Sequence, residues 1–568
     1  MLGHMQALSP RELGAHLPGA PRSRASTLNV TFRREAALEA ALVLSLSVLT
    51  VILRLVSRSH YLFNWDSIQF ALGIQRFDLL AHRPHPPGYL GYIALGRAFT
   101  HAAGGDPQLG LVLLSAVAEG LAVVLAYLAA RAAWGRFAGW SASILLATSP
   151  LFWIYGGVGL TYALEPALTI GVIWLAMRAC HGDRHALAGA ALVAAVGGAI
   201  RPTDEIFLAM PVAWAAYCLW RGGQTRQVLA AGGLGLAATL AWLIPLIAAS
   251  GGIARYVVAS RELSARASAT SAVWKLGLDG LRINVSAVVF AFMLALGLFL
   301  PVALAYLLSR RLLRVEALAR PGGRDFVMLS AALMIPALVV YDFVHIGQMG
   351  YVLLLLPPIL LPAGVALDSL ARVVAHRRAS IARWSALATC ALANIAIFAL
   401  PAGGLRDQVV QNDRYDADVI SVVRRFDPAT TVLVTDADAQ GSYRLAQYYL
   451  ADYPVVALGL DRREHAGEMF STRGPAPQYD LARFDHAGAP VFPRDTRTVL
   501  VLDSATLRLM GDSSQLGAVP FGNRWRIWVY HGDDQPVALG RYVFLRPQDC
   551  PCRGASKARP VPVPNAAL

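Results

Sequence analysis

The chain has 568 residues, of which 56% are hydrophobic and only 15% are charged, and its mean hydropathy is +0.48. Soluble domains carry about 25% charged residues, so the composition excludes an ordinary soluble protein and predicts an integral membrane protein. The formal net charge is +14, yet basic and acidic residues balance at 19 each from Leu405 onward. A basic excess confined to the part before Leu405 is typical of short loops at an anionic membrane face, not of a nucleic-acid surface.

The N-terminal residues 1–31 are polar and rich in Arg, Pro, Gly and Ser, which predicts a disordered cytoplasmic tail. No short apolar segment with a cleavage site comes first, so the first span is expected to be a retained anchor. Residues 32–404 then contain about eleven apolar runs of the length that crosses a bilayer. Their centres lie near Leu46, Val117, Leu145, Ile173, Val193, Val212, Leu240, Leu296, Leu333, Leu356 and Leu392.

The loops between these runs fall into two alternating sets. One set carries arginine in every loop and is therefore expected in the cytoplasm; its loops begin at Arg33, Arg131, Arg178, Trp220, Ser309 and Ala371. The other set is then expected outside and comprises residues 60–88, 157–166, 200–205, 250–286 and 342–351. An odd number of spans leaves the N-terminus in the cytoplasm and sends the C-terminal part outside, which in a bacterial cytoplasmic membrane is the periplasm.

Residues 405–568 have a soluble pattern and predict a small extracytoplasmic α/β domain. TVLVTDADA and TRTVLVLDS are short apolar runs that end in acidic turns, RWRIWVYHG and GRYVFLRP alternate, and GSYRLAQYYLA has helical spacing. Cysteine is sparse. Cys180, Cys218 and Cys390 are expected to pack in apolar runs, and the Cys550 and Cys552 pair is too little for a zinc site, which leaves a disulfide or no role.

The polar stretch after the first apolar run is the first candidate for chemistry. Asp66 lies at the expected boundary between membrane and water, where a raised pKa would suit a general base. An ordinary interfacial acid beside Trp65 explains the same position equally well. Arg83 precedes a rigid proline turn, and a guanidinium there suits a phosphate or diphosphate. His82 and His85 are spaced to share a metal, but no third ligand stands out, so hydrogen-bonded loop histidines are favoured and a divalent metal is left as an unsupported alternative, with no cofactor certain.

Further candidates lie in the other loops expected outside. Glu165 begins an apolar helix, where the helix dipole alone would favour an acid, and Asp204 caps the next helix or binds substrate. Arg201 is harder to explain structurally, because arginine is disfavoured on this side, so a second anion contact is expected. His345, Gln348 and Tyr351 follow the spacing of one face of a broken helix and suit sugar hydroxyls or ordinary interfacial contacts. Residues 250–286 predict an amphipathic segment on the membrane surface.

Two motifs carry a resemblance to a known family: Asp66-Ser67 after the first span, and the HPPGY sequence from His85 to Tyr89. Because of these motifs, the chain up to about residue 400 resembles the type C (GT-C) superfamily of polytopic membrane glycosyltransferases, which use polyprenyl-phosphate sugars. Within that superfamily it is most similar to bacterial members and to protein O-mannosyltransferase-like members. The resemblance implies an α-helical polytopic GT-C-like fold, and the α/β domain that follows is predicted from its own sequence pattern. It covers none of the soluble tail.

The resemblance also implies a mechanism. Asp66 would deprotonate an acceptor hydroxyl, whose oxygen displaces the polyprenyl phosphate with inversion, and arginine would hold the leaving phosphate, with Arg83 and Arg201 as candidates. His85, Tyr89, Asp204 and the loop of Tyr351 complete the expected substrate site. Several family members carry a second acid in the first loop, whereas Ser67 follows Asp66 here. The second acid is therefore open between Asp78 and Glu165, and metal dependence is weakened.

The expected partners are a polyprenyl-phosphate sugar donor, a lipid, glycan or protein acceptor, and the bilayer. A membrane transporter or lipid flippase is the main alternative. It would need charged residues within spans and symmetry between two halves, whereas the charges here lie at helix ends and no convincing repeat is found. A membrane-anchored scaffold that acts through its soluble tail is the third reading.

Overall fold

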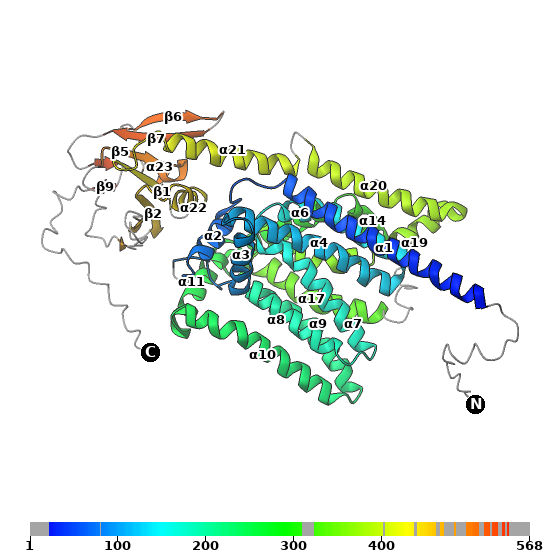
Figure 1. Ribbon diagram of the computed structural model, residues 1–568. Coiled ribbons are helices and arrows are strands. Elements are labelled where there is room, and N and C mark those ends of the chain that lie inside the picture. Colours follow the sequence, from blue (N-terminus) through cyan, green and yellow to red (C-terminus); the bar gives the residue numbers. More distant parts are fainter. Residues whose placement is uncertain are drawn as a thin grey trace.

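The computed structural model describes residues 22–79, 81–308, 323–400, 404–436, 440–461, 466–470, 482–483, 496–510, 516–522, 525–531, 537–539 and 542–544. The first 21 residues of the expected tail, and the pair Cys550 and Cys552, lie outside the described residues. Most of the described chain forms one large helical part, and a sheet with three helices follows at the C-terminal end (Figure 1).

The helical part runs from α1 to α20. Its helices are α1 Arg22–Val56, α2 Trp65–Gln75, α3 Leu90–Ala102, α4 Pro107–Trp134, α5 Arg136–Thr148, α6 Pro150–Gly156, η1 Thr161–Leu164, α7 Glu165–Cys180, α8 Ala186–Ile200, α9 Pro202–Arg221, α10 Thr225–Ala249, α11 Ile253–Ser271, α12 Val273–Leu276, α13 Leu278–Leu296, α14 Phe299–Leu308, α17 Gly323–Phe343, η2 Met349–Leu355, α18 Leu356–Leu360, α19 Ala363–Ala375, η3 His376–Arg378 and α20 Ala379–Ala399.

Every predicted apolar run contains a helix, but the count of about eleven spans is not confirmed. Among the described residues, seven helices are long and apolar enough to cross a membrane, or eight if the bent pair α5 and α6 is one span. Helix α8 has 15 residues, which at about 1.5 Å per residue falls short of a hydrocarbon core of about 30 Å. The segment 349–360 is shorter still, and 363–399 forms one long apolar unit. The chain is a multi-pass membrane protein.

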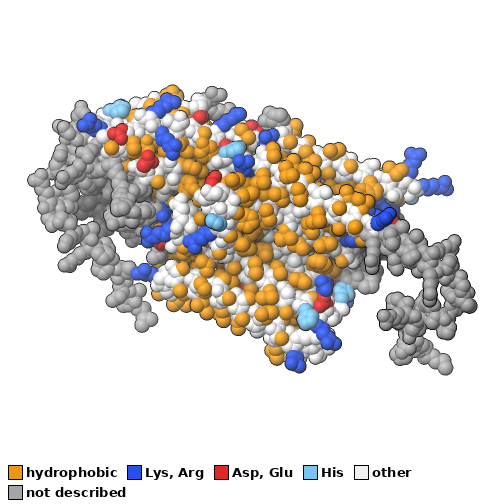
Figure 2. All heavy atoms as spheres, in the orientation of Figure 1, with side chains coloured by type: hydrophobic (Ala, Val, Ile, Leu, Met, Phe, Trp, Pro, Cys, Tyr) orange, Lys and Arg blue, Asp and Glu red, His pale blue; other side chains and the backbone are white. Residues whose placement is uncertain are grey.

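The outer surface of the helical part is apolar. Figure 2 shows hydrophobic side chains over most of the visible face, with Lys and Arg gathered toward its ends. Helix α10 illustrates the pattern, because Leu229, Leu236 and Ile244 are 70%, 61% and 59% exposed. Apolar side chains directed outward on this scale are favourable only against lipid.

The C-terminal part confirms the predicted α/β domain. A seven-stranded sheet has the order β4-β3-β2-β1-β5-β7-β6, in which β1 pairs parallel with β2 and β5 and the remaining pairs are antiparallel. The strands are β1 Thr431–Asp436, β2 Val455–Asp461, β3 Ala466–Phe470, β4 Ala482–Arg483, β5 Thr498–Val501, β6 Gly517–Phe521 and β7 Trp525–His531, with a separate pair β8 Val537–Leu539 and β9 Tyr542–Phe544; the helices are α21 Leu405–Val423, α22 Gln440–Tyr449 and α23 Ser504–Met510.

Helix α21 joins the two parts and holds the loop that follows α1. Its Asp413 carboxylate accepts hydrogen bonds from Ser59 Oγ at 2.5 Å, from the His60 amide at 2.8 Å and from the Tyr61 amide at 3.4 Å. On the opposite side, Tyr415 packs edge-on against Trp525 of the sheet, with ring centroids 4.8 Å apart. The C-terminal part is therefore bonded directly to the chain that leads into α2.

Candidate active site

Helix α2 presents Asp66, and a capping box fixes where this helix begins. Asn64 is the N-cap: its Oδ1 accepts from the Ser67 amide at 3.1 Å, while Ser67 Oγ accepts from the Asn64 amide at 3.0 Å. These reciprocal bonds satisfy two of the amides that a helix start leaves without partners. They place Asp66 in the first turn, where the helix dipole favours a negative charge.

The Asp66 carboxylate is held by a glutamine that lies far away in the chain, between α17 and η2. Gln348 Nε2 donates to Asp66 Oδ2 at 2.6 Å, and Asn64 Nδ2 donates to Gln348 Oε1 at 3.2 Å. The Asp66 side chain keeps 15% of its surface exposed, so a small group can reach it. Burial raises the pKa of Asp66 to about 6, although the positive charges of Arg201 and Arg444 oppose the shift. This carboxylate suits proton abstraction near neutral pH.

The HPPGY loop brings His85 to the other side of Asp66. His85 Nδ1 lies 3.5 Å from Asp66 Oδ1, and His85 Nε2 lies 2.8 Å from Tyr89 Oη. Burial and the nearby arginines lower the pKa of His85 to about 3, so the contact with Asp66 involves a neutral imidazole and is not an ion pair. Gly88 has φ of 123°, and a Cβ at this position would collide with Leu246, so the loop needs glycine there.

A second polar cluster is centred on Arg201, which precedes α9 and is 3% exposed. Its Nη1 lies 2.7 Å from Glu165 Oε1, and its Nε lies 3.7 Å from Asp204 Oδ1. The guanidinium carbon lies 4.7 Å from the ring centroid of Tyr162 and 4.0 Å from that of Tyr351. Two acids and two aromatic faces therefore fix this arginine in one orientation.

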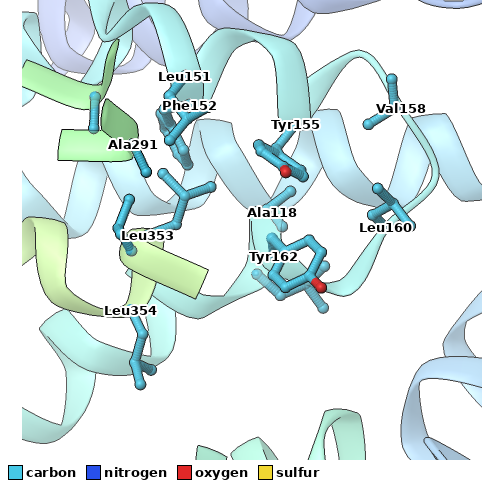
Figure 3. Close-up of a cluster of buried hydrophobic side chains, with 14 of the residues drawn as sticks. Ala118, Leu151, Phe152, Tyr155, Val158, Leu160, Tyr162, Ala291, Leu353 and Leu354 are labelled. Carbon is cyan, nitrogen blue, oxygen red and sulfur yellow. The ribbon is translucent and has the colours of Figure 1, made fainter. Parts of the chain in front are cut away.

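A tightly packed apolar core adjoins the two clusters. Figure 3 shows Tyr155 and Tyr162 close together, with Leu151 and Phe152 of α6 and Leu353 and Leu354 of η2 to their left. Tyr155 Oη accepts a hydrogen bond from the Gly350 amide at 2.8 Å. This bond attaches the segment between Gln348 and Tyr351 to the core, and thereby fixes the two side chains that contact Asp66 and Arg201.

Most of the residues selected from the sequence come together here. Eight of them form the two linked groups just described: Asp66, His85, Tyr89, Glu165, Arg201, Asp204, Gln348 and Tyr351. Arg83 is 2% exposed and lies on the same loop as His85. His345 is placed differently, because its Nδ1 lies 2.9 Å from Ser271 Oγ, at the end of α11.

Several residues of the site were missed from the sequence. Asn64 carried a signal, since Asn64-x-x-Ser67 is a capping pattern. Nothing in the sequence indicated Tyr155 or Tyr162 as site residues, because aromatic residues in apolar runs are ordinary core residues. Arg444 lies far away in the chain, on α22, yet its charge acts on Asp66. Among the described residues, no three His, Cys, Asp or Glu side chains are grouped to hold a metal ion.

Comparison with solved structures identifies the class of fold. ArnT from Cupriavidus metallidurans superposes with TM-scores of 0.54 in its apo state and 0.55 bound to undecaprenyl phosphate; each alignment has 12% identity and covers 87% of this chain and 98% of ArnT. The Archaeoglobus fulgidus oligosaccharyltransferase, in complex with Zn and sulfate, aligns at 11% identity and a TM-score of 0.45, over 84% of this chain and 72% of that one.

The expected GT-C-like polytopic fold is therefore confirmed, and ArnT is one solved structure that shares it. No protein-family model matches the sequence, and no curated protein matches it. The finer resemblance to protein O-mannosyltransferases stays a prediction.

Proposed function

We propose that this chain is an inverting glycosyltransferase that moves a sugar from a polyprenyl-phosphate donor to an acceptor hydroxyl. The observation that carries the proposal is Asp66, a partly exposed carboxylate with a raised pKa that Gln348 and His85 hold in place beside buried arginines. A fixed general base next to cations is the arrangement that sugar transfer from a lipid phosphate needs. The likeness to ArnT, whose structure was solved with undecaprenyl phosphate, supports the same donor class.

The proposed reaction is a single displacement. Asp66 takes the proton of the acceptor hydroxyl while the oxygen forms a bond to the anomeric carbon of the sugar. The bond between that carbon and the phosphate oxygen breaks, and its electron pair leaves with the polyprenyl phosphate. Attack from the side opposite the phosphate inverts the anomeric centre, and arginine compensates the charge that develops on the phosphate.

The contacts of Glu165 refine its expected role as a second catalytic acid. Its carboxylate is fully buried and engages Arg201 at 2.7 Å, so we propose that it positions Arg201 and exchanges no proton with substrate. Arg201 in turn fixes the ring of Tyr351. Tyr351 and Gln348 are then the proposed contacts for sugar hydroxyls.

We place the reaction at the outer face of the bacterial cytoplasmic membrane. The support is the arginine bias of the alternate loops, which assigns the N-terminus to the cytoplasm and the 405–568 domain to the periplasm. We propose that the C-terminal domain selects which acceptor, a lipid, a glycan or a protein, reaches Asp66.

The test is a transfer assay with purified protein and labelled polyprenyl-phosphate sugars. Asp66→Asn is expected to lower turnover at least about 100-fold, as loss of a general base does. Asp106→Asn is the matched control, because the Asp106 side chain caps α4 through the amides of Gln108 and Leu109, and asparagine caps equally well. Folded Asp66→Asn protein with wild-type turnover would contradict the proposal. Labelled lipid that crosses proteoliposomes without covalent transfer would favour a transporter.

A further inference from the structure

Gly347 is the one bare position in a segment that is otherwise fixed to its surroundings. This segment runs between α17 and η2. On one side of Gly347, the Ile346 amide donates to Asn284 Oδ1 at 3.4 Å; on the other side, Gln348 Nε2 donates to Asp66 Oδ2 at 2.6 Å. Gly347 itself is exposed, and its φ lies outside the left-handed region. The backbone conformation therefore does not require glycine here, and the space beside it needs another explanation.

Two polar atoms border the space where a side chain at position 347 would begin. A Cβ on Gly347 would lie 3.1 Å from His345 Nε2 and 3.2 Å from Tyr351 Oη. Both distances are shorter than the ordinary contact of a methyl group, so even an alanine would press against the two atoms. The bare face of Gly347 thus keeps His345 Nε2 and Tyr351 Oη open to the same space.

The imidazole of His345 is oriented through its other ring nitrogen. His345 Nδ1 lies 2.9 Å from the hydroxyl of Ser271, the last residue of α11, which is 4% exposed. The Ser271 carbonyl accepts from Asn284 Nδ2 at 3.0 Å, which attaches this end of α11 to α13. Burial lowers the pKa of His345, so its imidazole is neutral near neutral pH. Because Nδ1 is used by Ser271, Nε2 has one hydrogen bond left to offer, as a donor or as an acceptor.

The hydroxyl of Tyr351 is oriented by the packing of its ring. The guanidinium carbon of Arg201 lies 4.0 Å from the ring centroid, and Tyr341 packs edge-on with ring centroids 5.3 Å apart. The Tyr351 and His345 side chains are half-buried. Within the part of the chain that the structure describes, neither Tyr351 Oη nor His345 Nε2 has a hydrogen-bond partner. Two oriented polar atoms beside one open face form a subsite for a polar ligand.

The chemistry and position of this subsite suit the hydroxyl groups of a sugar. A neutral imidazole and a phenol both exchange hydrogen bonds with hydroxyl groups, and neither brings a charge of its own. The next residue, Gln348, holds Asp66, and consecutive Cα atoms are only about 3.8 Å apart. A sugar ring whose anomeric carbon faces Asp66 therefore extends over the face of Gly347.

We propose that Gly347 determines which sugar is accepted, because its bare face admits one edge of the sugar ring to His345 Nε2 and Tyr351 Oη. The inference rests on the proposed function and names a neutral, hydroxylated sugar as its substrate class. One hydroxyl at this edge exchanges hydrogen bonds with the two atoms, and the same two side chains exclude bulkier substituents. Ser271 is a positioning residue, since it acts through His345.

The test measures binding of the sugar separately from binding of its lipid. The affinity for a polyprenyl-phosphate sugar is compared with that for polyprenyl phosphate alone, without any acceptor. The probes are polyprenyl-phosphate mannose, glucose and xylose, together with analogues of each that lack one hydroxyl. The wild type is expected to prefer one sugar, and to bind one of its deoxy analogues about two- to tenfold more weakly, as for the loss of a neutral hydrogen bond.

Tyr351→Phe is the sharpest variant, because it keeps the ring over Arg201 and removes only the hydroxyl. It should bind the preferred sugar about two- to tenfold more weakly, bind polyprenyl phosphate as the wild type does, and no longer distinguish the critical deoxy analogue. This loss of additivity is the signature of direct contact, which a merely structural role would not give. Tyr217→Phe is the matched control, because Tyr217 Oη bonds to Arg221 at 3.3 Å, at the end of α9 that is farthest from Arg201.

Gly347→Ala tests the bare face itself. The added methyl group should weaken sugar-dependent binding at least about tenfold and abolish the preference among the three sugars. Gly232→Ala of α10 is the control, because a Cβ there would meet no described atom within 4 Å. If Gly347→Ala fails to fold, Tyr351→Phe carries the comparison.

The outcomes separate this inference from the proposed function. Sugar-dependent binding that is lost in both variants upholds the inference even where no acceptor receives the sugar. Equal binding of polyprenyl phosphate with and without sugar by the wild type overturns it. Sugar transfer by the wild type, with the same sugar preference in folded Tyr351→Phe and Gly347→Ala, also overturns it and leaves the proposed function standing.

Discussion

Two buried arginines, Arg54 and Arg201, each bond to a glutamate, but their surroundings differ. Arg54 of α1 is completely buried; its Nε lies 2.6 Å from Glu119 Oε2, and its Nη2 donates to the Ala147 carbonyl at 2.8 Å. The guanidinium carbon lies 4.6 Å from the ring centroid of Trp153. This pair joins α1 to α4 and α5, and none of its contacts within the described part of the chain reaches Asp66.

Arg201 has one more acid and a different neighbourhood. Asp204 joins Glu165 beside it, two tyrosine rings enclose it, and its charge acts on Asp66. A buried ion pair by itself therefore says little about function in this molecule. Both arginines lie over aromatic rings, so what distinguishes the candidate site is a second carboxylate beside the arginine and a partly exposed carboxylate nearby.

The largest expected effect comes from matched arginine substitutions. Arg201→Gln should lower transfer per folded molecule by about 10²–10³, because it removes fixed positive charge from the site. Arg54→Gln should leave that turnover unchanged. Each single change should cost roughly 3–5 kcal/mol of stability, because each strands a buried carboxylate. Turnover is measured with labelled donor. Thermal unfolding of the same samples gives the stability and the amount of folded protein by which the turnover is divided.

The Arg54 pair offers its own control. Arg54→Met combined with Glu119→Leu removes both charges and should regain most of the stability lost in Arg54→Gln. Equal losses of turnover in Arg54→Gln and Arg201→Gln would mean that the two clusters do not differ in function.

A smaller effect is expected when the glutamine that holds Asp66 is shortened. Gln348→Ala removes the 2.6 Å hydrogen bond to the carboxylate, and a bond to a charged group contributes about 1.5–3 kcal/mol. Turnover should fall about tenfold or more, mostly in kcat. Gln411→Ala is the control, because Gln411 makes a similar bond of 2.7 Å to Asp407 on the surface of α21. Equal kcat in both variants would show that Gln348 does not orient the base.

The smallest effect is the dependence on pH near neutrality. With a pKa of about 6, Asp66 should lose base activity as pH falls, and kcat/KM should drop about tenfold per unit well below pH 6. The contribution of Asp66 to the free energy of unfolding depends on pH in the opposite direction. The folded pKa lies above the unfolded value of about 3.9, so the contribution is greatest at low pH and is lost as pH rises through about 6. A kcat/KM that stays flat from pH 7 to pH 5 would exclude Asp66 as the base.

The fold was predictable from hydropathy and two motifs to the extent that these report local structure. Helices occur at all predicted runs, and TVLVTDADA and TRTVLVLDS became the parallel neighbours β1 and β5. The number of spans was not predictable, because apolar periodicity does not separate a crossing helix from a short buried one such as α8.

The candidate site was predictable only in those residues that local sequence patterns could select. Loop polarity and sidedness selected Asp66, Arg201 and Gln348, which the fold brings together. The sequence did not indicate that Glu165 engages Arg201, or that Arg444 approaches from the C-terminal part. Both are contacts between distant segments, and only the packing of the folded chain creates them.

The three hydrogen bonds that Asp413 accepts from the loop after α1 have a consequence for dissection by truncation. A deletion that begins at the start of α21 would remove the C-terminal part. It would also remove the three hydrogen bonds that hold the segment leading to Asp66. Loss of activity in a shortened chain would therefore have two explanations: a displaced Asp66, or the loss of the C-terminal part itself. Asp413→Asn in the intact chain tests these hydrogen bonds alone, because it removes the charge of the acceptor and leaves the C-terminal part in place.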